Sequence, residues 1–247
     1  MTKIILLSNN KGGPGKTTAA YYLALRWACA HRVSLLDLDG QCNLTDMIAP
    51  ATHDISISDV LANRASIEQA IAPVTLPTGE TLNLVRAAGD LYDMEAELST
   101  GLGVMRLYHA LRNADDLLGD VCIIDTPPNL GALTLSAIIA VGMLHGWVIV
   151  PTIPTANSVS GILSVQAKIN EAQQIPGCRP ALLGVIATQT RGTNIHNKWL
   201  AALRSGLYPP LLGETPYRGG QMMEYELRRV YNSIADLIWA MTGGDAT

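Results

Sequence analysis

The sequence of 247 residues lacks paired cysteines. Its four cysteines are widely spaced, with no C-x-x-C pair: Cys29, Cys42, Cys122 and Cys178. This spacing argues against a zinc site and against a disulfide framework, and it favours buried or incidental thiols in a reducing compartment. A chain of this length can build a hydrophobic core without such cross-links.

An export signal and an unbroken apolar span are also missing. Residues 1–4 lead directly into the first apolar run, which leaves no room for a charged, then apolar, then small-residue signal. The most apolar region, 137–150, is interrupted by two glycines and His145 and is closed by Pro151. We therefore expect a cytoplasmic protein in which this region is a helix end followed by a buried strand.

A general excess of basic charge is absent, because the formal net charge is −4. The charge is unevenly distributed, however, since residues 179–229 contain seven basic and three acidic side chains. A basic segment in an acidic chain is a candidate surface for a polyanion, and ordinary solvated surface is the alternative. The candidate nucleic-acid contacts in this segment are Arg191, Lys198, Arg204, Arg218 and Arg228.

The chain does contain a glycine-rich loop directly after the apolar residues 4–7. The loop reads Lys11-Gly12-Gly13-Pro14-Gly15-Lys16-Thr17-Thr18. Glycines let backbone N–H groups approach phosphate oxygens, a lysine supplies charge for the β- and γ-phosphates, and a hydroxyl ligates Mg²⁺. Residues 18–30 are rich in Ala and Leu, so they predict a helix whose positive end faces the phosphates. The loop therefore predicts a nucleotide site.

This loop carries one lysine more than phosphate binding requires. Lys16 occupies the position of the ordinary P-loop lysine, and Lys11 is the additional one. Asn10 stands where the general pattern has its first glycine, so the match is to a variant loop. The second lysine indicates a nucleotide-dependent switch.

Acidic residues follow two further apolar runs. Asp37 and Asp39 end the run that begins at Val33, and Asp125 ends residues 121–125. Carboxylates at the carboxyl ends of parallel strands are well placed to hold Mg²⁺ or its waters beside Thr17. Asp37 and Asp39 point the same way on an extended strand, so one can orient the attacking water while the other braces the loop.

Short apolar runs alternate with helical stretches, which predicts one α/β domain over residues 1–247 with a doubly wound, mostly parallel sheet and helices on both faces. The expected strands are 3–8, 33–38, 81–87, 121–125, 147–151 and 181–188. The expected helices are 17–31, 56–62, 66–71, 89–98, 104–113, 132–141, 158–173, 194–205 and 222–241. Residues 47–77 have the weakest pattern, and we expect an insertion or mobile surface there.

The last expected helix carries a single apolar stripe. Its positions are Met223, Leu227, Val230, Tyr231, Ile234, Leu237, Ile238 and Met241. A membrane-targeting helix would carry basic residues on its polar face, but none follows Arg229. We therefore expect this stripe to dock onto the core of the chain itself.

Three segments together resemble the ParA/MinD superfamily of deviant Walker A P-loop ATPases, and within it the ParA (Soj) DNA-partition ATPases. They are residues 11–18, 35–43 and 123–131, which resemble the Walker A, A′ and Walker B segments. The resemblance implies a P-loop NTPase fold, ATP and Mg²⁺ as ligands, and an ATP-sandwiched homodimer. It also implies non-specific DNA binding at the nucleoid, without membrane attachment, and slow hydrolysis stimulated by a ParB-like centromere-binding partner.

The resemblance also implies roles for single residues. Lys11 is the signature lysine that reaches the phosphates of the partner subunit, and Lys16 is the P-loop lysine. Thr17 and the Walker B acid Asp125 are metal ligands, and Asp39 is placed at the metal and orients the hydrolytic water. Gln189 and the turn at Pro216-Tyr217 are the candidate adenine contacts.

The sequence departs from this family at two loops and leaves other functions open. Pro14 stands where a small aliphatic residue is usual, and Gly40 and Cys42 replace a proline and a glycine. The alternatives are a MinD-like membrane-associated division-site ATPase, an electron-transfer ATPase resembling the nitrogenase iron protein, and a small-molecule amidoligase. The second of these requires paired cysteines for a cluster.

Overall fold

The computed structural model describes residues 1–48, 54–217 and 224–243. Over these residues, eight strands form one sheet in the order β3-β4-β2-β5-β1-β6-β7-β8. Neighbouring strands run parallel except β3 and β4, which pair antiparallel at one edge. The strands are β1 (Lys3–Leu7), β2 (Val33–Asp37), β3 (Ile71–Thr75), β4 (Thr81–Val85), β5 (Val121–Asp125), β6 (Trp147–Thr152), β7 (Ala181–Thr190) and β8 (Leu211–Pro216).

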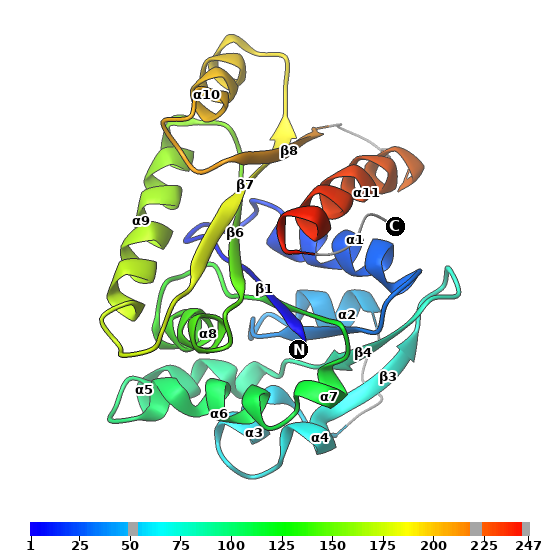
Figure 1. Ribbon diagram of the computed structural model, residues 1–247, viewed down its shortest axis with the longest axis vertical. Helices are drawn as coiled ribbons and strands as arrows, with labels where there is room; N and C mark the ends of the chain where they lie inside the picture. The colour runs from blue at the N-terminus through cyan, green and yellow to red at the C-terminus, as the bar shows by residue number, and fades with distance from the viewer. Residues whose placement is uncertain (49–53, 218–223, 244–247) are drawn as a thin grey trace.

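Helices cover both faces of this sheet. Figure 1 shows α1 and α11 on one side, and α8 and α9 on the other. The helices of the described residues are α1 (Lys16–Ala28), α2 (Asn43–Ile48), α3 (Ile57–Leu61), α4 (Ile67–Ala70), η1 (Gly89–Tyr92), α5 (Met94–Leu98), η2 (Gly103–Met105), α6 (Arg106–Arg112), α7 (Asp115–Leu118), α8 (Ala132–Met143), α9 (Ala156–Ala172), α10 (Asn194–Arg204) and α11 (Glu224–Met241).

Each face of the sheet has its own core because consecutive strand residues point in opposite directions. In β1, Ile4 and Leu6 pack in the core that includes α8, whereas Ile5 and Leu7 pack in the core that includes α1 and α11. Strands buried on both faces carry apolar residues at successive positions, which produces the unbroken apolar runs of the sequence. The doubly wound, mostly parallel sheet is confirmed.

Residues 47–77, the region with the weakest pattern, contain regular structure in the described residues after 53. This region forms α3, α4 and the edge strand β3. Ser56 and Ser66 each open a helix with a capping box, in which a side chain three residues later bonds back to the backbone N–H of the serine. Ile71, expected as a helix end, instead begins β3.

Five further elements differ from expectation. Residues 89–98 form a 3₁₀ turn and a short helix, η1 and α5, rather than one helix. The short helices α2 and α7 were not expected, and neither was strand β8. Thr215 and Pro216, expected as part of a turn, are the last two residues of β8, and Tyr217 follows the strand.

Helix α11 docks against α1 as expected, although not along the whole stripe. Tyr231, Ile234 and Ile238 are buried, and the Tyr231 ring stacks on the Tyr22 ring with centroids 5.4 Å apart. Leu237 and Met241 were expected in the same stripe, but they are 41% and 43% exposed. Met223 lies outside the described residues.

Candidate functional site

The loop after β1 is shaped by two glycines and held by the end of β7. Gly13 and Gly15 have φ angles of 79° and 80°, a left-handed conformation that glycine adopts without steric cost. The Thr188 hydroxyl donates to the Pro14 carbonyl at 2.7 Å. The Gln189 amide donates to the Gly13 carbonyl at 2.6 Å. The P-loop is therefore held by two side chains of β7, and its last residues form the start of α1.

The two lysines of the loop lie close to one another in the fold. The Lys16 ammonium is buried and donates to the Lys11 carbonyl at 3.3 Å. Burial lowers the pKa of Lys16, while the charges of Asp125 and Asp39 act in the opposite direction. A buried ammonium flanked by two carboxylates and opening a helix is an arrangement suited to phosphate oxygens.

Thr17 and Asp125 meet at the start of α1. The Thr17 hydroxyl donates to Oδ2 of Asp125 at 2.6 Å. The other oxygen, Oδ1, is buried and has no hydrogen-bond partner among the described residues. A hydroxyl beside an unpartnered carboxylate oxygen fits Mg²⁺, which takes oxygen ligands and is completed by waters and substrate phosphates.

Three carboxylates and one lysine set the charge of this site. Asp125 is 1% exposed, and burial raises its pKa to about 7. The hydrogen bond from Thr17 and the charge of Lys16 oppose this rise, whereas Asp37 and Asp39 add to it. A divalent cation bound at this position would favour the ionised form of Asp125.

Asp37 and Asp39, two residues apart, have different surroundings. Asp37 is fully buried and accepts hydrogen bonds from the Thr45 amide, the Thr45 hydroxyl and the Asp39 amide, at 2.9, 2.8 and 3.0 Å. Burial raises the pKa of Asp37 to about 6, although these hydrogen bonds lower it. Asp37 therefore joins the loop after β2 to α2.

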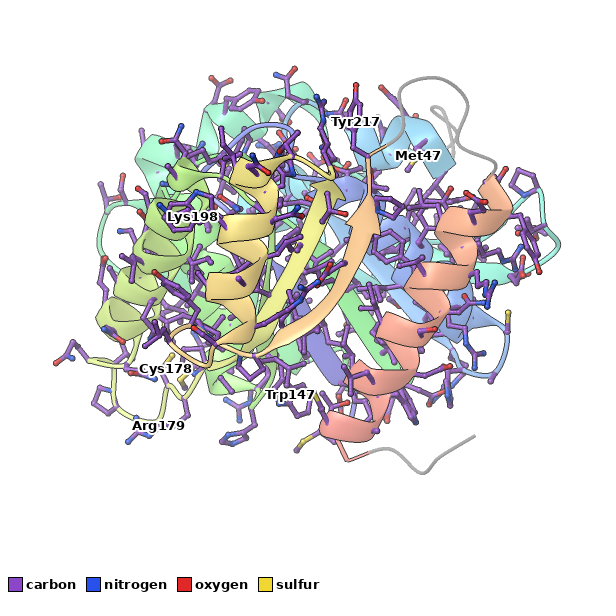
Figure 2. The ribbon with its side chains drawn as sticks, turned by 90° about the horizontal axis from the view of Figure 1, so that it is seen from above. Met47, Trp147, Cys178, Arg179, Lys198 and Tyr217 are labelled. Carbon is purple, nitrogen blue, oxygen red and sulfur yellow. The ribbon has the colours of Figure 1, made fainter. Side chains whose placement is uncertain are left out.

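The candidate adenine contacts lie beside the P-loop, at the carboxyl ends of β7 and β8. Tyr217 pairs with β7 through its amide, which donates to the Thr190 carbonyl at 2.7 Å. The Arg191 guanidinium lies over the Tyr217 ring, 3.5 Å from its centroid. In Figure 2, Tyr217 and Met47 lie at the same edge of the molecule, and Trp147, which begins β6, lies at the opposite edge.

Comparison with known proteins identifies the family of this chain. The AAA domain family profile matches residues 2–181. The virulence plasmid ParA family protein of Chlamydia psittaci is 30% identical over 187 residues, which cover 74% of this chain and 68% of that protein. The chain belongs to the ParA family.

Two further similarities agree with this family assignment. The chromosome-partitioning ATPase Soj of Thermus thermophilus is 31% identical over 192 residues, which cover 77% of this chain and 71% of that protein. A structure of cobyrinic acid a,c-diamide synthase from Mycobacterium smegmatis, with an ATP analogue and magnesium, is 28% identical with a TM-score of 0.80. That similarity covers 100% of this chain and 98% of the synthase chain. The fold is that of the P-loop ATPases.

The basic residues of the ParA-family chain differ in how far they are neutralised. Arg204 pairs with Glu214, and Arg228 pairs with Glu80 at 2.7 Å. Lys198 is exposed on α10, away from the edge that carries Arg179 (Figure 2). Arg218 lies outside the described residues.

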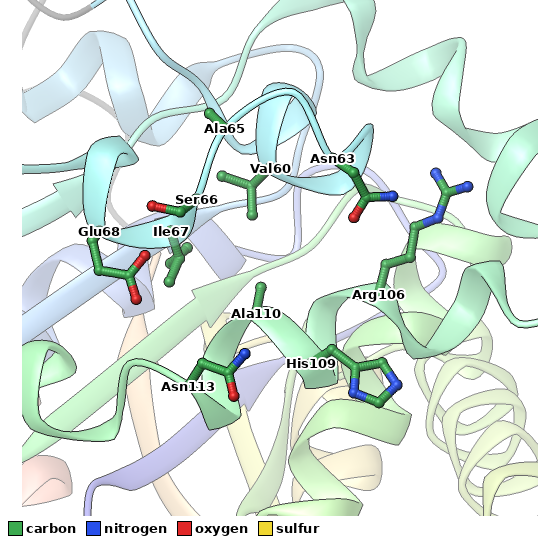
Figure 3. A pocket seen from close by; sticks show the side chains of 10 residues that line it. All are labelled: Val60, Asn63, Ala65, Ser66, Ile67, Glu68, Arg106, His109, Ala110 and Asn113. Atoms are coloured by element: carbon green, nitrogen blue, oxygen red, sulfur yellow. The ribbon is translucent and has the colours of Figure 1, made fainter.

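A separate pocket of about 230 Å³ lies beside α3, α4 and α6 (Figure 3). Arg106 and His109 of α6 lie on the same side of it as Asn63 in that view. The Arg106 guanidinium is already engaged, since it donates to the Leu61 carbonyl at 2.9 Å. None of the residues that line this pocket belongs to the P-loop. The pocket is therefore distinct from the ParA-family nucleotide site.

Two residues that contact the site segments were missed in the sequence. Thr188 ends an expected strand, and a polar residue at the carboxyl end of a parallel strand was a usable signal. Tyr92 donates to Oδ1 of Asp39 at 3.4 Å, but it lies in a segment expected to be a plain helix. Nothing in the local pattern marked that tyrosine.

Within the described residues, no helix is long and apolar enough to pass through a bilayer.

Proposed function

We propose that this chain is a DNA-partition ATPase. Two copies bind ATP and Mg²⁺ between them and bind DNA without sequence preference as the closed dimer. They then hydrolyse ATP slowly to ADP and phosphate. The observation that carries the proposal is the contact between Thr17 and Asp125 beside the buried Lys16, in a loop that also carries Lys11.

Each residue of the site has a role in this proposal. Lys16 and the backbone of residues 12–18 bind the phosphates. Thr17 and Asp125 would hold Mg²⁺, whose charge would offset the negative charge that develops on the phosphates during hydrolysis. Asp39 orients the water. Lys11 supplies a positive charge to the partner subunit's phosphates, which is what an arginine finger does in other P-loop enzymes.

The remaining parts of the proposal concern partners. Gln189, Pro216 and Tyr217 contact the adenine in this proposal. The proposal is supported by the contact of Gln189 with the P-loop and by the pairing of Pro216 and Tyr217 with the end of β7. DNA is bound by the basic residues of 179–229, among which exposed Lys198 is the first candidate. A ParB-like protein stimulates hydrolysis and so releases the dimer from DNA at the nucleoid.

The test is retention on DNA and dimerisation in the presence of ATP and Mg²⁺, compared between wild type and Lys11→Ala. We expect ATP-dependent dimers that bind DNA in the wild type, and monomers that bind ATP but not DNA in the variant. Lys168→Ala is the matched control, because Lys168 is a lysine on α9 that pairs with Glu171. Dimers and DNA binding that survive Lys11→Ala would contradict the role of Lys11.

The similarity to a diamide synthase favours one alternative, an ATP-dependent amide-forming enzyme. Such an enzyme would hydrolyse ATP only with a carboxylic acid and an amide-nitrogen donor present. A partition ATPase hydrolyses ATP without them and responds to DNA. Measuring phosphate release with DNA alone separates the two functions.

A MinD-like protein requires ATP-dependent binding to membranes. We expect no ATP-dependent binding of this chain to anionic lipid vesicles.

A further inference from the structure

One short segment contacts both the loop that carries Asp39 and the start of α8. This segment is η1 followed by α5, residues 89–98, and it packs beside α8. Tyr92 reaches the loop after β2, and Glu95 reaches the start of α8, which follows β5. The segment therefore links the loop that carries Asp39 to the start of α8, the helix that follows β5.

The Tyr92 ring lies directly against Gly40. A Cβ atom built on Gly40 would lie 2.7 Å from Cε2 of Tyr92 and 2.9 Å from Cδ2, closer than real side chains approach. Gly40 is not in the left-handed region, so its role is to leave space for the ring rather than to permit an unusual turn. Any side chain at position 40 must displace Tyr92 or the loop.

The Tyr92 hydroxyl joins the residues on either side of Gly40. It donates to Oδ1 of Asp39 at 3.4 Å and accepts from the Gln41 side-chain amide at 2.7 Å. The Gln41 backbone amide donates to the same Asp39 oxygen at 3.0 Å. The bonds from the Tyr92 hydroxyl and the Gln41 backbone amide both end on Oδ1, so they define one orientation of the Asp39 carboxylate. In this orientation Oδ2 is the oxygen that would contact a water.

Glu95 anchors the other end of the segment. Its Oε2 accepts from the Ala132 and Leu133 amides at 2.6 and 3.4 Å, which caps the N-terminus of α8. A Cβ atom on Gly131 would lie 2.6 Å from the same oxygen, so the glycine makes room for this carboxylate. The cap ties the segment that carries Tyr92 to the N-terminus of α8.

We propose that Tyr92 is a positioning residue for ATP hydrolysis, with its hydroxyl orienting Asp39 and its ring fitted to Gly40. The inference rests on the proposed function of Asp39 as the residue that orients water. Displacing a catalytic group by about 1 Å can cost about a hundredfold in rate, so a residue that only holds Asp39 still affects turnover. Nucleotide binding involves the P-loop and not Tyr92, and it should change little.

The test compares steady-state ATP hydrolysis by wild type, Tyr92→Phe and Asp39→Ala, with DNA present. Tyr92→Phe keeps the ring and removes the hydroxyl. We expect its kcat to fall about tenfold while its KM changes by less than about twofold, because only the orientation of Asp39 is lost. Tyr225→Phe is the matched control, since Tyr225 is an exposed tyrosine on α11.

A second comparison tests the fit between the ring and Gly40. Gly40→Ala alone should lower kcat, because the new methyl group displaces Tyr92. In a Tyr92→Ala background, the same Gly40→Ala change should have almost no further effect, so the two substitutions should be strongly non-additive. Additive losses would overturn the proposed fit.

The outcomes separate this inference from the proposed function. Wild-type kcat in Tyr92→Phe together with a large loss in Asp39→Ala would overturn the role of Tyr92 and leave that of Asp39 intact. Wild-type kcat in Asp39→Ala would overturn both roles. Absence of ATP hydrolysis by the wild-type protein, with and without DNA, would overturn the proposed function itself.

Discussion

Asp37 and Asp39 have the same side chain and lie two positions apart, yet they differ in burial and in hydrogen-bond partners. Asp37 accepts three hydrogen bonds from Thr45 and the Asp39 amide in a fully buried position. Asp39 keeps a small exposed fraction of 7% and contacts polar side chains. The sequence allowed either residue to brace the loop. The hydrogen bonds from Thr45 and the Asp39 amide favour Asp37 for that role.

The buried Asp37 predicts a pH dependence of stability in the protein without nucleotide. Its pKa rises from 3.8 to about 6 on folding, so the folded state holds a proton that the unfolded state releases between these pH values. The contribution to stability is therefore fully present below pH 4 and is lost as the pH rises through 6. The shift corresponds to about 3 kcal/mol.

Urea unfolding of wild type and Asp37→Asn between pH 4 and 8 measures this effect. Asparagine keeps one acceptor oxygen and cannot ionise, so the variant should lack the loss of stability between pH 4 and 6 that comes from Asp37. The readout is the difference between the two pH profiles, not the absolute stability of the variant. Parallel profiles for the two proteins would show that Asp37 does not titrate in this range.

At the scale of elements, the docking of α11 on α1 closes one face of the sheet. The contact is made by the stacked rings of Tyr22 and Tyr231 and by an ion pair between Arg26 and Asp236. The ion pair is partly exposed and contributes at most about 1 kcal/mol. The buried ring is the larger contribution, because Tyr231 is 1% exposed.

Removing that ring should destabilise the whole chain. We expect Tyr231→Ala to lower the free energy of unfolding by about 3–5 kcal/mol, as for other large buried aromatic residues. Tyr225→Ala, on the same helix at a site 69% exposed, should change it by less than about 0.5 kcal/mol. Thermal and urea unfolding of both variants provides the measurement, and equal losses would contradict the docked position of α11.

The strands that the sequence predicted and those it missed differ in burial. Strands such as β1 and β5 are covered on both faces, so four of the five residues in each are apolar and the run is visible in the sequence. The edge strand β3 is half exposed and contains Pro73, a residue that is tolerated at sheet edges. Strand β8 is the other edge strand, and it carries Gly213 and Glu214 in a partly buried position. Edge strands are not fully covered on both faces, so they lack the unbroken apolar run that marks a central strand.

The candidate site shows the same division. The P-loop and the strand-end acids could be predicted because phosphate and Mg²⁺ chemistry demands particular residue types at fixed spacing. Tyr92 and Glu95 act through contacts that span 53 and 37 positions along the chain. No local pattern encodes such contacts, because they depend on where α5 is placed by the rest of the fold.

The assignment of residues 1–247 to one domain stays a prediction.

At the scale of the whole molecule, an acidic chain that binds DNA must do so through a local basic surface. Affinity should therefore fall steeply as salt increases, because each phosphate contact releases counterions. We expect Lys198→Ala to weaken binding to all sequences alike and to reduce the slope of log K against log salt by about 1. Lys168→Ala is the control, since that lysine is paired with Glu171.

Filter binding or fluorescence anisotropy with ATP and Mg²⁺, at several salt concentrations, measures this slope. Arg228 should matter less to DNA affinity than Lys198, because its charge is already paired with a largely buried Glu80. An unchanged slope in Lys198→Ala would place the DNA surface elsewhere on the molecule. A slope near zero in the wild type would contradict electrostatic binding altogether.

The contacts of Thr188 and Gln189 with the P-loop have a consequence for the timing of the nucleotide cycle. Two consecutive carbonyl groups of the loop, those of Gly13 and Pro14, are occupied by side chains from the tip of β7. The loop cannot rearrange to release a spent nucleotide unless that tip moves with it. We therefore expect the rate of nucleotide release to depend in part on residues that lie 174 and 176 positions further along the chain than the loop carbonyls they contact.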